Sequence, residues 1–68
     1  MAQHPTIKER YQKPERFVTA LVVAELNART DWEIDFTNDL RARFEQYGAQ
    51  MMLSDLQQTQ LDRIATNR

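Results

Sequence analysis

The most apolar run of the chain is Phe17-Val-Thr-Ala-Leu-Val-Val-Ala-Glu-Leu26. On a helix of 3.6 residues per turn, Phe17, Leu21 and Ala24 form one stripe, and the remaining apolar side chains fall around the other side. A helix that is apolar all round must be buried on more than one face. The run therefore predicts a helix over about residues 14–28, around which the rest of a small chain is arranged.

A buried strand over residues 17–23 is the competing interpretation, because valine, phenylalanine and threonine favour strands. The sequence contains no second strand-like run to pair with it. Pro14 suits the first position of a helix, where its missing N–H costs nothing, and Glu15 is favourable in that first turn. The helix is therefore preferred.

A second helix is predicted over residues 31–47. Thr30 and Glu33 match a capping box, in which each side chain accepts a hydrogen bond from the other residue's backbone N–H. Gly48, the only glycine, suits the left-handed conformation that ends a helix. An aromatic stripe along this helix favours core packing over a base-stacking platform, which would need a basic groove. Its members are Trp32, Phe36, Leu40, Phe44 and Tyr47.

A third helix is predicted over residues 54–65. It begins at a second capping box, formed by Ser54 and Gln57. Its apolar side is the weakest of the three, because glutamines fall within it. The last residues are expected to fray.

The predicted fold is an all-α domain of three helices in a single unit over residues 14–66. The second and third helices form a helical hairpin, and the apolar first helix packs across them. Residues 1–13 carry both charge signs and no sustained periodicity, which indicates an extended or mobile arm.

The length of 68 residues fits one small domain, which is marginally stable alone. With no cysteine and one histidine, the chain lacks the groups for disulfides or a structural zinc site. Oligomerisation is the remaining way to stabilise so small a domain, so we expect a homodimer. The uninterrupted apolar segment, residues 20–24, is too short to span a bilayer, and the absence of cysteine agrees with a cytoplasmic location.

An acidic cluster has the alternate spacing that opens a calcium-binding EF-hand loop: Asp31, Glu33 and Asp35. That loop needs a glycine at the position of Phe36 and a glutamate at the position of Ala42. The cluster is therefore interpreted as a helix start that complements the helix dipole, and no metal site is expected.

Candidate catalytic residues are equally scarce. His4 is the only imidazole and lies in the predicted arm, without the rigid setting that acid–base catalysis requires. Ser54 is the only serine, and a capping role accounts for it. We expect no enzyme activity and no cofactor.

Four cations near the start form the only set suited to phosphate contacts: Lys8, Arg10, Lys13 and Arg16. Glu9 and Glu15 lower the net charge of this segment to +2, so a solvated arm is the favoured interpretation. DNA contact stays open as the alternative. A ribbon-helix-helix regulator would require a strand over residues 6–11, and Glu9 falls on the face of that strand that should be apolar.

The predicted interface residues are Val18, Val22, Val23, Leu26, Met51 and Met52. The valines and the leucine lie on the face of the first helix that the other two helices do not cover. The methionines are adaptable side chains suited to varied partners, although at least one of them is expected in the core.

The pattern Trp32-Glu-x-x-Phe-x-x-Asp-Leu-x-x-Arg43, followed by Leu53-Ser-x-x-Gln-x-x-x-Leu-x-Arg-Ile64, resembles small helical proteins of bacteriophages, prophages and plasmids. The resemblance covers about half of the chain and implies two packed helices and a mobile-element origin, but no activity. We therefore expect a non-enzymatic protein-interaction module, an accessory protein of a phage or plasmid that binds a cellular protein. The alternative is a small dimeric DNA-binding regulator that uses the basic arm.

Overall fold

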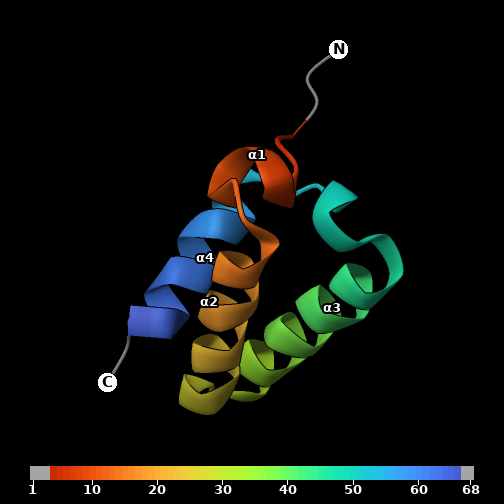
Figure 1. Ribbon diagram of the computed structural model, residues 1–68. Helices are drawn as coiled ribbons and strands as arrows, with labels where there is room; N and C mark the ends of the chain where they lie inside the picture. The colour runs from red at the N-terminus through yellow and green to blue at the C-terminus, as the bar shows by residue number, and fades with distance from the viewer. Residues whose placement is uncertain (1–3, 67–68) are drawn as a thin grey trace.

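The computed structural model describes residues 4–66 (Figure 1). These residues form four α-helices and one 3₁₀ turn, and they contain no β-strand longer than an isolated bridge. The elements are α1 (Ile7–Tyr11), α2 (Pro14–Asn27), α3 (Asp31–Tyr47), η1 (Gly48–Gln50) and α4 (Asp55–Thr66). The predicted all-α class is confirmed. The bounds of the three long helices agree with prediction within one residue.

Helix α2 is the centre of the fold and lies between α3 and α4 (Figure 1). It packs most extensively against α4 and next against α3, whereas α3 and α4 make few contacts with each other. The predicted hairpin of α3 and α4 is therefore wrong. The physical reason is loop length: residues 28–30 turn the chain sharply and pair α2 with α3, while residues 48–54 carry it to the opposite flank of α2.

The hydrophobic core gathers around the inward stripe of α2. Phe17, Leu21 and Ala24 are fully buried, which confirms the stripe that the sequence predicted. The Phe17 ring contacts the ring of Phe44 at 5.1 Å and that of Tyr11 at 5.6 Å between centroids. The remaining buried apolar residues come from every other part of the fold: Ile7, Leu40, Met51, Leu53, Leu61 and Ile64.

The N-terminal segment is not an extended arm over the residues that the structure describes. Thr6 and Glu9 form a capping box at the start of α1, and Ile7 is fully buried in the core. The Ile7 N–H donates to Met51 O at 2.9 Å, and the Leu53 N–H donates to Pro5 O at 2.9 Å. The prediction of an arm missed a helix of five residues, which is too short to show periodicity. Residues 1–3 lie outside the described residues.

The inward face of α3 differs from the predicted aromatic stripe. Leu40 is buried and Phe36 and Phe44 are partly buried, but Trp32 and Tyr47 are 52% and 57% exposed. Glu33 and Thr37 are buried in their place.

The cause of this rotation is the helix cap. The Glu33 carboxylate accepts hydrogen bonds from the backbone N–H groups of Arg29 and Thr30, at 3.0 and 3.1 Å. These bonds hold the glutamate against the α2–α3 turn, with Arg63 of α4 at 3.6 Å. The side of α3 that carries Trp32 is thereby turned towards solvent.

The Ser54 capping box and the helix end at Gly48 agree with prediction, but Gly48 does not adopt the predicted left-handed helical conformation. Ser54 and Gln57 bind each other's backbone N–H groups at 3.1 and 2.9 Å, as a capping box requires. Gly48 ends α3 with a φ of 59°, and its N–H donates to Phe44 O. A side chain at this position would be strained, because its ψ of −139° lies outside the left-handed helical region as well.

Candidate protein-interaction surfaces

The first candidate surface is the outward side of α2, which we call the α2 outer face and which consists of Val22, Val23 and Leu26. Their side chains are 39%, 37% and 80% exposed. The prediction that the rest of the chain leaves these residues uncovered is confirmed. Val18, predicted in the same set, is half-buried beside them.

The two flanks of α2 are held by polar contacts. Arg41 of α3 binds Glu25 through two hydrogen bonds, with Nε at 2.9 Å from Oε2. On the other flank, the Asn27 side-chain amide donates to the carbonyl oxygens of Ile64 and Ala65 at the end of α4, at 3.1 and 3.0 Å. These contacts orient α2 between its neighbours and direct its third side outwards.

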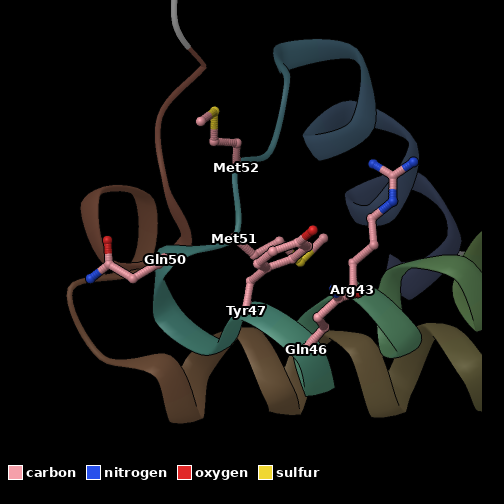
Figure 2. A pocket seen from close by; sticks show the side chains of 6 residues that line it. All are labelled: Arg43, Gln46, Tyr47, Gln50, Met51 and Met52. Carbon is pink, nitrogen blue, oxygen red and sulfur yellow. The ribbon is translucent and has the colours of Figure 1, made fainter.

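The second candidate surface is a hollow of about 590 Å³ at the end of α3, which we call the tyrosine hollow (Figure 2). It is lined by Arg43, Gln46, Tyr47, Gln50, Met51 and Met52. Its volume lies within the range of pockets that bind a side chain or a small ligand. The hollow is open to solvent, because Tyr47 and Met52 remain more than half exposed.

The walls of the tyrosine hollow are fixed by the backbone around them. Met51 is buried, and its carbonyl accepts the hydrogen bond from Ile7, while Met52 forms an isolated bridge with Thr6. The chain after α3 is therefore fastened to the N-terminal segment. Figure 2 shows Arg43 and Tyr47 projecting from α3 on the side where the two methionines lie.

The lining has the chemistry of a protein-binding surface. Tyrosine, methionine and arginine are enriched at interfaces, where a large apolar contact is joined to a polar rim. The Arg43 Nε lies 3.1 Å from Asp39 Oδ2, one helical turn earlier, and about half of the Arg43 side chain stays exposed. Gln46 and Gln50 add amide groups that donate and accept hydrogen bonds.

An aromatic pair extends this surface along α3. The rings of Trp32 and Phe36 are stacked, with 5.2 Å between centroids and 9° between planes. Helical periodicity places them on the same flank of α3 as Arg43 and Tyr47. We call these four residues the aromatic flank of α3.

The predicted interface set is therefore divided by the structure. Val22, Val23 and Leu26 share the α2 outer face, whereas Met52 lies in the tyrosine hollow. Met51 is almost completely buried, so its core role outweighs an interface role. The aromatic flank was missed because its spacing also fits a buried stripe.

The predicted nucleic-acid set is also divided. Arg10 is turned back onto the protein: its Nε donates to Leu53 O at 2.9 Å and its Nη2 lies 2.7 Å from Asp55 Oδ1. Its side chain is only 16% exposed. Lys8, Lys13 and Arg16 are exposed. The interpretation of Arg10 as a phosphate contact is thus corrected to a contact that fastens α1 to α4.

Three carboxylates, those of Glu25, Glu33 and Asp55, accept hydrogen bonds that stabilise the fold. The pKa of Glu33 is lowered chiefly because the Arg29 and Thr30 amides donate to its carboxylate. The pKa of Glu25 is lowered by its hydrogen bonds from Arg41, and that of Asp55 by its hydrogen bond from Arg10. Each of these carboxylates is therefore favoured in its charged form.

The remaining candidate groups do not converge on a site. Asp31 and Asp35 are exposed while Glu33 is turned inwards, and within residues 4–66 no three carboxylate, imidazole or thiol groups are grouped to hold a metal ion. His4 is exposed, and Ser54 accepts a hydrogen bond from the Gln57 N–H.

Comparisons of the chain with family models, with curated proteins and with solved structures found no match. In the part of the chain that the structure describes, no helix combines the length and the apolar character needed to cross a bilayer.

Proposed function

We propose that this protein is a non-enzymatic interaction module that binds another protein through the aromatic flank of α3 and the tyrosine hollow. The observation that carries the proposal is a preformed hollow lined by Tyr47 and Met52, which are both more than half accessible, together with an equally accessible Trp32 near the other end of α3. Large exposed apolar side chains beside an arginine are typical of the few residues that dominate binding energy.

The hollow favours a macromolecular partner over a free small molecule. Small-molecule sites enclose most of the ligand surface, whereas this hollow is open to solvent and shares Arg43 and Tyr47 with the aromatic flank. A partner that inserts one large apolar side chain above Met51 would contact Tyr47 and Met52, and its backbone would lie within reach of the glutamine amides. Binding of this kind needs no catalytic residue.

The resemblance to small helical proteins of phages, prophages and plasmids is part of the proposal. An accessory protein of a mobile element that binds a protein of the host cell would need such a surface and no active site. The cysteine-free composition agrees with a cytoplasmic location for this encounter.

Affinity capture from a host lysate with the tagged full chain tests the proposal. We expect a protein retained by the wild type and lost with Tyr47→Asp, because a carboxylate in the hollow opposes apolar contact. Ile34→Asp is the matched control: it is also exposed and on α3, but it lies on the opposite flank. Equal retention by wild type and Tyr47→Asp would contradict the proposal.

A further inference from the structure

A regular strip runs along the outward side of α2 and continues past the apolar residues. Its members, which we call the α2 strip, are Glu15, Thr19, Val22, Leu26 and Arg29. The first four follow one another within α2 at spacings of 4, 3 and 4, the repeat by which two helices pack along their length, and Arg29 lies in the turn after α2, where Ala28 is extended. All five side chains are exposed, with Arg29 two residues beyond the end of α2. The strip thus has an apolar centre and opposite charges at its two ends.

We propose that the α2 strip binds the same strip of a second copy of this chain, antiparallel, around a two-fold axis at Val22. In that register each Val22 faces its counterpart, and Leu26 faces Val18 of the second copy. Glu15 faces Arg29 of the second copy. Because the arrangement is symmetric, the ion pair occurs twice.

Charge complementarity favours a second copy of this chain as the partner of the α2 strip, in the antiparallel direction. A parallel pairing would place Glu15 beside Glu15 and Arg29 beside Arg29, and like charges repel. Within residues 4–66, neither Glu15 nor Arg29 has an ion-pair partner in its own chain. The neighbouring Glu25 already binds Arg41, so it does not compete for Arg29.

The distance along α2 from Val22 to Glu15 is compatible with this pairing. With a rise of about 1.5 Å per residue, Glu15 lies about 10 Å along the helix from Val22. Helices that cross at about 20° and lie about 8 to 10 Å apart remain close over that distance, so Glu15 of one copy would lie beside the turn after α2 of the other copy, which carries Arg29. A steeper crossing would separate them.

The dimer would leave the tyrosine hollow free in each copy, since none of its lining residues belongs to the α2 strip. It goes beyond the proposed function by making the module bivalent. A partner with two binding segments would then bind more tightly than its single sites allow.

Sedimentation equilibrium of the full chain over about 5 to 500 µM tests the pairing, with the circular dichroism of each variant as a check of folding. We expect a reversible dimer for the wild type and a monomer for Val22→Asp, which would place two carboxylates on the axis. The fold should survive, because Val22 is exposed. Tyr47→Asp is the control and should still dimerise, so failure of dimerisation and failure of partner capture are distinguished.

Charge reversal tests the register. Glu15→Arg and Arg29→Glu should each raise the dimer dissociation constant about tenfold, because each change turns two attractive pairs into repulsive ones. The double variant should return to within about threefold of wild type. A monomeric wild type, a dimer unaffected by Val22→Asp, or a double variant as weak as the single ones would overturn the proposal.

Discussion

Helix α2 has two apolar sides that the protein treats in opposite ways. The inward side, with Phe17, Leu21 and Ala24, is completely buried, whereas the outward side keeps Val22, Val23 and Leu26 accessible. Both sides consist of apolar side chains. The apolar pattern therefore predicts the helix and one buried stripe, whereas the positions of α3 and α4 determine which side of α2 stays exposed to solvent.

A carboxylate placed on each side of α2 should have the most unequal effects. Leu21→Asp should cost more than about 4 kcal/mol of unfolding free energy, because it buries an unpaired carboxylate. Leu26→Asp, on the same helix, should change the stability of the monomer by less than about 0.5 kcal/mol, measured at a protein concentration below the dissociation constant of the proposed dimer. Urea denaturation of the two variants measures the difference. Equal destabilisation would mean that the outward side is covered within the chain.

A second test extends the comparison to the N-terminal segment. Ile7→Ala should cost about 2 to 5 kcal/mol, because Ile7 is fully buried in the shared core. Lys8→Ala, the neighbouring exposed residue, is the control and should be nearly neutral. Thermal unfolding of both variants gives the result. A neutral Ile7→Ala would restore the interpretation of residues 4–13 as a solvated arm.

A third and smaller effect concerns the polar contacts that orient α2. Glu25 and Glu33 have folded-state pKa values below their ordinary value of 4.5. Their stabilisation is therefore complete above that value and is lost as the pH falls through the lowered pKa values of the folded state. The melting temperature should fall when the pH is lowered from neutral to about 3.

Glu33→Gln provides the matched comparison for the pH experiment. This variant should be less stable than wild type at neutral pH, because the amide is a weaker acceptor for the Arg29 and Thr30 N–H groups. The melting temperature of this variant should also fall less than that of the wild type when the pH is lowered. The same acid dependence in wild type and variant would show that Glu33 is not coupled to folding.

Local signals in the sequence were sufficient to predict where the three long helices begin and end. The bounds of α3 and the start of α4 follow from the capping boxes at Thr30 and Ser54, which act within a few residues. Gly48 ends α3 for the same reason. The inward stripe of α2 was predictable too, because its spacing is a property of one helix.

Contacts between distant residues were not predictable in this way. The capping box at Thr6 was present in the sequence, but burial of Ile7 depends on its N–H donating to Met51 O and on the Leu53 N–H donating to Pro5 O. The exposure of Trp32 depends on Glu33 turning inwards at the turn between α2 and α3. A regular aromatic spacing has the same form whether its stripe faces core or solvent.

The helical class, the three long helices, their caps and the buried stripe of Phe17, Leu21 and Ala24 follow from the amino-acid sequence, because all of these depend on neighbours within one or two helical turns. Only the tertiary structure decided that α2 lies between α3 and α4, that Arg10 binds the start of α4, and that the tyrosine hollow forms. These features join residues far apart in the chain, and their positions depend on how loops return and which flanks pack. The apolar run from Phe17 to Leu26 shows both contributions, since its helix was predictable and its open side was a consequence of packing.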